Sequence, residues 1–253
     1  MAEFFVKEDS TLKQELFSFL MKEKNKPDIF CLQEFHHDDA ERQKVMDELT
    51  ILTGLKYYYT LPVFDPNQNG FSSLMTMSRF PIVKKGILFQ SESDSVNMGM
   101  YLDVMTPDDT VRVINIHLQS MSIRINDTSK TSLTDKLFDV VERLKKGSIR
   151  SKDQIQPVLD IIKNSPYPVL LCGDFNTFPY GYSYQKAKEL LNNSFESAGK
   201  GFGYSLNIFP YLGRIDNQFC SEEFIPIESR VIREVKQSDH FPVFAKYVFK
   251  KRE

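Results

Sequence analysis

Acids, amides and histidines recur in this sequence where apolar runs end. The run PVLLC, residues 168–172, is followed at once by Gly173-Asp174-Phe175-Asn176. Taken alone, an Asp-x-Asn pair after such a run is most often a turn, because Asp and Asn are ordinary turn formers. The alternative is a carboxylate and an amide that are held at the rim of a sheet to do chemistry.

Similar groups lie at the ends of other apolar runs. They are Glu34, Asn115, His117, Asp216, Asp239 and His240. Each has an ordinary structural interpretation when it is taken singly, such as a solvated acid, a core histidine or a cap. Side chains at strand ends converge on one edge of a sheet, however, and sites usually form there. We therefore expect these groups to share one site.

The residue types indicate the chemistry of that site. Carboxylate and amide oxygens are hard ligands, which suit Mg²⁺ or Mn²⁺ better than zinc. Such an ion neutralises a phosphate and stabilises charge in an in-line displacement. A histidine beside a carboxylate can be held in one orientation and kept protonated to bind a phosphoryl oxygen. With an acid such as Asp174 to orient or deprotonate the attacking water, the set favours metal-assisted hydrolysis of a phosphate ester.

The elements that must position these groups are helices mixed with many short strands. Helical spacing of apolar residues predicts helices over 11–24, 38–52 and 183–193, and two helices within 131–163 that are separated near residues 146–148. Strand-like runs cover 28–34, 56–61, 71–77, 82–89, 100–105, 111–118, 168–172, 214–220, 224–232 and 241–249. Mixed helices and antiparallel strand runs predict an α/β or α+β layered fold.

Composition limits the class of protein. The 253 residues, 41% hydrophobic and 26% charged, suit one large domain or two small ones. The net charge of −2 lacks the basic excess of a dedicated nucleic-acid binder, which lowers the odds of a DNA or RNA substrate without excluding it. Three widely spaced cysteines argue against a disulfide framework or a zinc site. No signal peptide or membrane-length apolar run is visible, so we expect a soluble domain.

Six blocks of the sequence resemble the endonuclease/exonuclease/phosphatase superfamily, which includes nucleases, sphingomyelinases and inositol polyphosphate phosphatases. The blocks are PDIFCLQE, SRFPI, INIHLQS, GDFN, RID and SDHFPV, in the family's order. Any one block is weak, but six in order are highly specific, and the chain looks most similar to generic bacterial members. The resemblance implies a DNase I-like four-layer α/β sandwich, with two central mixed, mainly antiparallel sheets flanked by helices. One such domain would span residues 1–253.

The resemblance also implies roles for individual residues and a Mg²⁺ cofactor, with Mn²⁺ as an alternative. Glu34 and Asp239 match metal-binding acids, His117 a phosphate-contacting histidine, Asp174 the residue that positions water, Asn176 the amide that binds the scissile phosphate, His240 the catalytic histidine and Asp216 the carboxylate that orients it. The family also opens with a strand that carries an asparagine, and nothing before residue 11 matches it. We therefore expect this strand to be missing, which would leave an open, apolar sheet edge. The domain would be cytoplasmic, or tethered to a membrane by a lost N-terminal segment.

The substrate stays open at this stage. A nucleic acid, a phospholipid headgroup and a small phosphoester all fit, and no obligate protein partner is implied. The loop 196–214 is a candidate substrate wall in which Lys200 or Arg214 meets a phosphate, and an ordinary glycine-rich turn is equally compatible with it. Asn115 is a further candidate for substrate binding. The alternative function is a catalytically impaired binding domain that kept the fold, which the survival of both GDFN and SDH disfavours.

Overall fold

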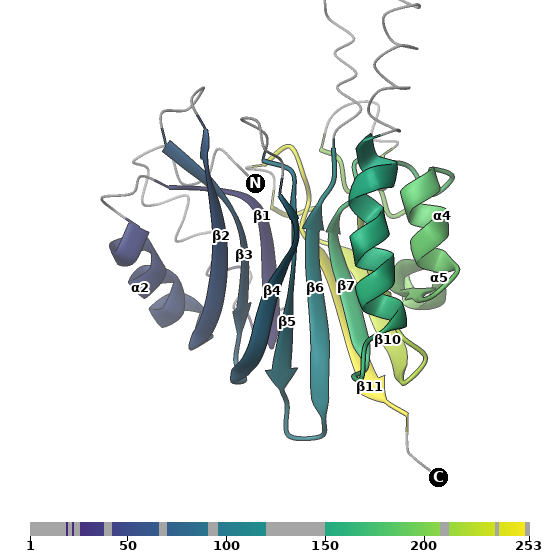
Figure 1. Cartoon of the computed structure of the whole chain (residues 1–253), viewed down its shortest axis with the longest axis horizontal. Helices are drawn as coiled ribbons and strands as arrows, with labels where there is room; N and C mark the ends of the chain where they lie inside the picture. The colour runs from purple at the N-terminus through teal and green to yellow at the C-terminus, as the bar shows by residue number, and fades with distance from the viewer. Residues whose placement is uncertain are drawn as a thin grey trace, which may run out of the picture.

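The computed structural model describes residues 19, 22, 26–37, 42–65, 70–90, 96–119, 150–207, 213–235 and 238–250. Their arrangement is shown in Figure 1. The helix expected over 11–24 and the first part of the helical region expected over 131–163 lie outside the described residues. All ten predicted strand ranges overlap strands of the structure, which confirms a layered α/β fold with mixed sheets.

The larger sheet has six strands in the order β4-β5-β6-β7-β9-β8. Their bounds are β4 Ile82–Gln90, β5 Met98–Met105, β6 Thr110–His117, β7 Val169–Asp174, β8 Asn192–Asn193 and β9 Asp216–Cys220. Neighbouring strands are antiparallel except β6 and β7, which run parallel. A parallel pair needs a long crossover connection, and the helical residues 150–163 lie within it.

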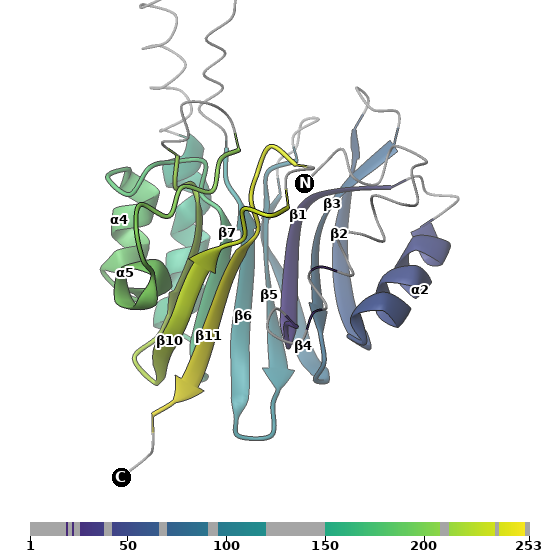
Figure 2. The same ribbon diagram turned by 180° about the vertical axis from the view of Figure 1, so that it is seen from behind.

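Two smaller sheets lie on one face of the larger one (Figures 1 and 2). Their strands are β1 Ile29–His37, β2 Tyr57–Asp65, β3 Gly70–Ser78, β10 Phe224–Val231 and β11 Val243–Phe249. The first sheet has the order β1-β3-β2, and the second is the antiparallel pair β10-β11. The helix at 150–163 and α4 (Tyr182–Lys188) cover the other face of the larger sheet, and α2 (Arg42–Thr53) packs on the sheet of β1 and β3.

Apolar clusters join these layers. One cluster packs Ile114 and Ile116 of β6 against Ile155, Val158 and other side chains of the helix at 150–163. A second fills the space between the larger sheet and the two smaller ones, and a third lies under α2. Because β5 and β6 are covered on both faces, nearly every side chain along them is buried, polar ones included.

Strands β1 and β11 each have one described neighbour in their sheets. Among the described residues, β1 pairs with β3 alone and β11 pairs with β10 alone. Leu170 and Cys172 of β7 remain partly exposed, although β7 lies inside its sheet. Figure 2 shows β6 in view between β1 and β11. The absence of a first strand from the chain, and the open sheet edge that it would leave, both stay predictions.

The prediction of one helix over 183–193 was wrong at its C-terminal end. Helix α4 ends at Lys188, and Asn192 and Asn193 instead form the short strand β8 beside β9. The side chain of Asn193 then accepts the backbone N–H of Glu196 at 3.0 Å and so begins the helix α5 (Ser194–Ala198). An asparagine at the N-cap position, directly before a helix, is a strong signal for a helix start. Here this signal outweighs the apolar periodicity that predicted one continuous helix.

No helix among the described residues is both long and apolar enough to span a bilayer.

Candidate active site

The register of three neighbouring strands brings predicted site residues into one row. His117 at the end of β6 lies opposite Asp174 at the end of the parallel strand β7. Asp174 lies in turn opposite Asp216, with which the antiparallel strand β9 begins. All three side chains therefore lie at the same edge of the sheet, as expected from their positions at strand ends.

The turn after β7 fixes where Asp174 and Asn176 lie. Gly173 has a φ of 148°, and a Cβ at this position would collide with the backbone oxygen of Ile116. The backbone N–H of Asn176 donates to Oδ1 of Asp174 at 2.7 Å, and the side-chain nitrogen of Asn176 donates to the carbonyl of Leu118 at 2.9 Å. The segment is thus a turn, and the same turn holds the carboxylate at the edge of the sheet.

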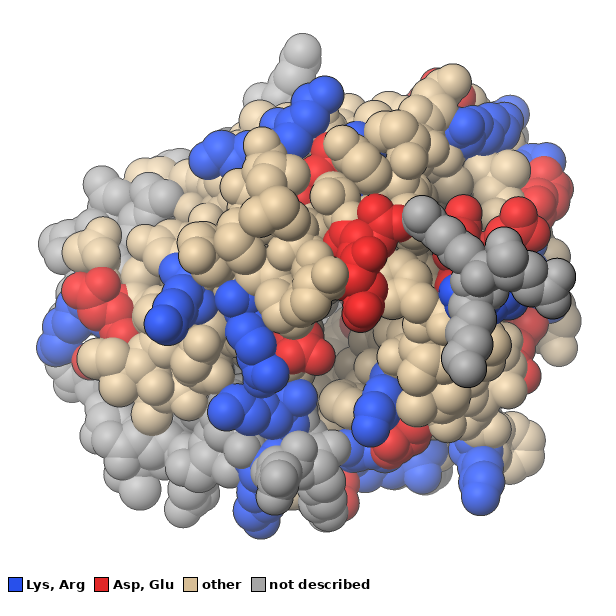
Figure 3. Space-filling view, turned by 90° about the horizontal axis from the view of Figure 1, so that it is seen from below, with Lys and Arg blue, Asp and Glu red and all other residues tan. Residues whose placement is uncertain are grey.

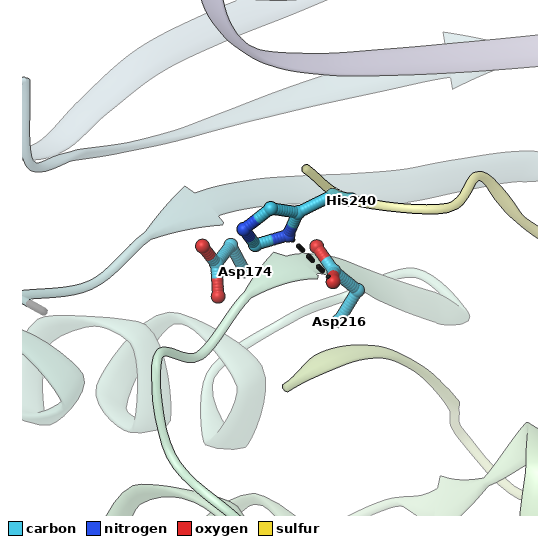
Figure 4. Close-up of side chains that lie close together, drawn as sticks. All are labelled: Asp174, Asp216 and His240. Atoms are coloured by element: carbon cyan, nitrogen blue, oxygen red, sulfur yellow. Dashed lines mark hydrogen bonds and ion pairs between the residues drawn. The ribbon is translucent and has the colours of Figure 1, made fainter. Parts of the chain in front are cut away.

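His240 comes from the loop before β11 and meets this row. Its Nδ1 lies 2.8 Å from Oδ2 of Asp216, and the ring lies between Asp216 and Asp174 (Figure 4). One ligand atom of each of the three residues lies within 4.8 Å of the others. A backbone bridge between Leu206 and His240 fixes the loop. His240 and Asp216 therefore form an oriented pair beside a second carboxylate.

Burial and neighbouring charges shift the pKa values of Asp174 and His240. Burial and the charge of Asp216 raise the pKa of Asp174 to about 6, although His240 and His117 oppose the shift. Burial lowers the pKa of His240, but the charge and hydrogen bond of Asp216 outweigh it and raise that pKa to about 10. At neutral pH the site therefore holds a protonated imidazolium next to a carboxylate that exchanges protons near neutrality, which is a pattern of acid–base sites.

The His240 pair predicts a pH-dependent stability of the metal-free protein. The pKa of His240 is raised above the value of 6.5 that it has when unperturbed. Its stabilisation is therefore fully present below pH 6.5 and is lost as the pH rises toward 10. In EDTA, the difference in Tm between wild type and His240→Gln should be several degrees near pH 6.5 and should narrow toward pH 10. Thermal melts at both pH values measure it, and a difference that grows with pH would contradict the assignment.

Glu34 and His117 form the second part of the group. Nε2 of His117 lies 3.4 Å from Oε1 of Glu34 and 3.7 Å from Oδ2 of Asp174. Nδ1 of His117 lies 3.0 Å from the carbonyl of Val96, so it carries a proton and donates it there. Nε2 is thereby directed toward the two carboxylates.

Backbone strain coincides with this group. Among the described residues, Glu34 and Asn176 are the two that have a positive φ without being glycine, at 50° and 48°. The pairing of β1 with β3 is interrupted between Leu32 and Phe35, and this bulge turns Glu34 out of the regular ladder. Residues in such conformations cost stability and cluster at functional sites.

Other predicted residues lie away from the row. The side chain of Asn115 is 0% exposed and donates to the backbone of Met75 at 2.9 Å while it accepts from Gln33 at 2.6 Å. It thus joins β6 to the sheet that carries Glu34. Lys200 is exposed on a loop. Substrate roles for these two residues stay predictions.

Arg214 is also predicted to bind substrate, and its described contacts lie on the helical side of the site. Its guanidinium donates to the hydroxyl of Tyr184 at 3.0 Å and to Glu196 at 3.3 Å, and it stacks on the ring of Phe195. These contacts anchor the loop that leads into Asp216. Binding of substrate by Arg214 stays a prediction as well.

Sequence reasoning missed Ser205, whose hydroxyl accepts the backbone N–H of Asp216 at 3.0 Å. A single serine in a glycine-rich stretch gives no periodic or motif signal. The contact arises only when the loop folds back beside β9.

The donor set fits a hard divalent cation. Glu34 reaches the group through His117, and Asp239, which is exposed, directly precedes His240. Burial and the charge of Asp216 raise the pKa of Asp174, and an added positive charge would oppose that shift. Asp174, Asp216 and His240 also have ligand spacing.

A cavity of about 400 Å³ lies at the opposite end of the molecule. Its lining includes the acids Asp108, Asp109, Glu222 and Glu223. Figure 3 shows acidic side chains gathered at this end. An acidic lining repels phosphate esters, so the cavity does not compete with the row of strand ends as a phosphate site.

Comparison with known proteins identifies the family and the fold. A profile described as "Endonuclease/Exonuclease/phosphatase family" matches residues 9–240. No curated protein sequence matches significantly.

Solved structures are similar at low sequence identity. A family protein from Leptotrichia buccalis has a TM-score of 0.71 at 16% identity, over 98% of this chain and 97% of that one. A family protein from Beutenbergia cavernae has a TM-score of 0.68 at 20% identity, over 94% of this chain and 66% of that one. A mannosyl-6-phosphatase from Bacteroides thetaiotaomicron has a TM-score of 0.60 at 20% identity, over 94% and 91%. These likenesses establish the fold.

Proposed function

Because the chain belongs to the endonuclease/exonuclease/phosphatase family, we propose that it is a divalent-metal-dependent hydrolase of phosphate esters. The observation that carries the proposal is the His240–Asp216 hydrogen bond of 2.8 Å beside Asp174. A positively charged acid and a carboxylate with a pKa near 6 are the two proton-transfer groups that such a hydrolysis needs.

Each residue has a role in this proposal. Asp174 orients the attacking water and accepts its proton. His240, held by Asp216, binds a phosphoryl oxygen, stabilises the charge that develops on it and gives its proton to the leaving oxygen. His117 and Asn176 contact the other oxygens of the scissile phosphate and set its orientation.

A Mg²⁺ ion, or Mn²⁺ in its place, is the proposed cofactor, with Glu34 and Asp239 as its ligands. When bound there, the ion supplies neutralising charge to the phosphate. Asp174 is buried and the nearby Asp216 is partly buried, which supports a need for such a charge.

The proposal extends to the fold and the substrate. The alternation of apolar clusters, sheets and helices supports the four-layer sandwich. A nucleic acid, a phospholipid headgroup and a small phosphoester all remain substrate classes, and the mannosyl-6-phosphatase among the similar structures adds sugar phosphates to the substrates worth testing.

The test is hydrolysis of bis-p-nitrophenyl phosphate by the purified chain. We expect turnover with Mg²⁺ or Mn²⁺ and its loss in EDTA. Glu34→Gln should raise the Mg²⁺ concentration for half-maximal activity by at least about 10-fold, because one charged ligand is lost. Glu228→Gln is the matched control, since that carboxylate pairs with Arg230 on β10.

Two outcomes would reject this function. Turnover that resists both EDTA and His240→Ala would place the activity elsewhere. A folded protein that binds phosphate esters without turning them over would instead support the binding-domain alternative.

A further inference from the structure

Ser205 connects the two loops that carry the acid–base pair. Its backbone N–H donates to the carbonyl of Gly213 at 2.8 Å, three residues before Asp216. Its own carbonyl accepts the N–H of Phe241 at 2.6 Å, one residue after His240. A single residue thus hydrogen bonds with both segments, and its position sets how Asp216 and His240 approach each other.

The hydroxyl of Ser205 makes all the hydrogen bonds that a hydroxyl can make. The side chain is 0% exposed, and its oxygen accepts the backbone N–H groups of Ile215 at 3.2 Å and Asp216 at 3.0 Å. A hydroxyl accepts two hydrogen bonds and donates one. The remaining proton has the carbonyl of Gly213 as its acceptor, at 3.5 Å.

Asp216 is thus held at two points. Nδ1 of His240 holds its Oδ2 at 2.8 Å, and the Ser205 hydroxyl holds its backbone N–H at 3.0 Å. Because the backbone is fixed by Ser205, the carboxylate stays in the orientation that faces His240. That orientation directs His240 toward Asp174 (Figure 4).

We propose that Ser205 is a positioning residue, which fixes the carboxylate of Asp216 toward His240. The inference rests on the proposed function, because it assigns the proton-transfer pair of that site. Ser205 does not touch the substrate in this scheme, so it acts on the rate and not on binding.

The test compares variants that lack or keep the hydroxyl. Ser205→Ala is expected to lower kcat about 10- to 100-fold with KM changed less than 2-fold, because the hydrogen bonds that hold the backbone of Ile215 and Asp216 are lost. Ser205→Thr should recover most of kcat. The matched control is Ser229→Ala, since the buried Ser229 hydroxyl has no partner among the described residues and lies on β10.

A second readout does not depend on turnover. The proton on Nδ1 of His240 should give a downfield ¹H NMR signal in wild type and in Ser205→Thr. It should move upfield or broaden in Ser205→Ala. If wild type hydrolyses nothing, the proposed function fails, while this signal still decides the role of Ser205.

Three results would overturn the inference. They are an unchanged kcat in Ser205→Ala, an equal loss in a folded Ser205→Thr, and an NMR signal that Ser205→Ala leaves in place. If Ser205→Thr does not fold, the kcat and the NMR signal of Ser205→Ala decide alone.

Discussion

Replacement of His240 by glutamine is expected to lower kcat by about 10²- to 10⁴-fold while the protein still folds. Glutamine can donate a hydrogen bond to Asp216, but it carries no charge and transfers no proton. The imidazolium at this position is protonated at neutral pH because the carboxylate of Asp216 lies 2.8 Å from its Nδ1. Steady-state hydrolysis of bis-p-nitrophenyl phosphate in saturating Mg²⁺ measures the loss.

Asp216→Asn provides the comparison for this variant. It keeps the shape of the side chain and removes the charge that keeps His240 protonated, so a large loss in kcat is expected here too. Because the two residues act as one unit, the double variant should lose little more than either single variant. If His240→Gln kept more than a tenth of wild-type kcat, His240 would not be the charged acid of the reaction.

Replacement of Asp174 by asparagine is expected to change activity and stability in opposite directions. The kcat should fall at least about 100-fold, because an amide cannot accept a proton from water. The free energy of unfolding in EDTA at pH 8 should rise by about 1–3 kcal/mol, because burial raises the pKa of Asp174 to about 6 and the ionised form is costly above that pH. An amide oxygen can still accept the N–H of Asn176, so the turn is retained.

Asp160→Asn is the matched control for this variant. Asp160 is exposed on the helix at 150–163, where it accepts the side-chain amide of Gln156 at 2.9 Å. The activation free energy that corresponds to kcat and the free energy of unfolding should each change by less than about 0.5 kcal/mol. Urea unfolding and kinetics on the same samples measure both effects. A less stable Asp174→Asn protein would show that the buried charge is already compensated in the absence of metal.

The strands were predictable because their signals are local. The run at 71–77 is rich in apolar residues and follows the turn residues Asn69-Gly70, and it became most of β3. The run at 100–105 became part of β5. The prediction of one helix over 183–193 was wrong because the end of the helix depends on β9, which lies further along the chain. Asn192 and Asn193 pair with β9 and so form a strand. Local periodicity cannot register such a pairing.

The site was predictable to the extent that strand ends share an edge. His117, Asp174 and Asp216 meet because the register of β6, β7 and β9 aligns them. Asn115 shares a face of β6 with His117 but lies two residues, or roughly 6.6 Å, deeper in the sheet. That depth makes it a bridge between sheets, and the sequence does not show where the covering sheet begins.

The left-handed backbone at Glu34 has a consequence for any attempt to make this protein more robust. Glycine in place of Glu34 would adopt that conformation freely. A neutral residue in place of Asp174 would remove a buried charge. Both changes favour the folded chain and remove a group on which the proposed reaction depends. A laboratory selection for heat resistance alone would therefore tend to enrich inactive variants, so the screen must couple survival to turnover.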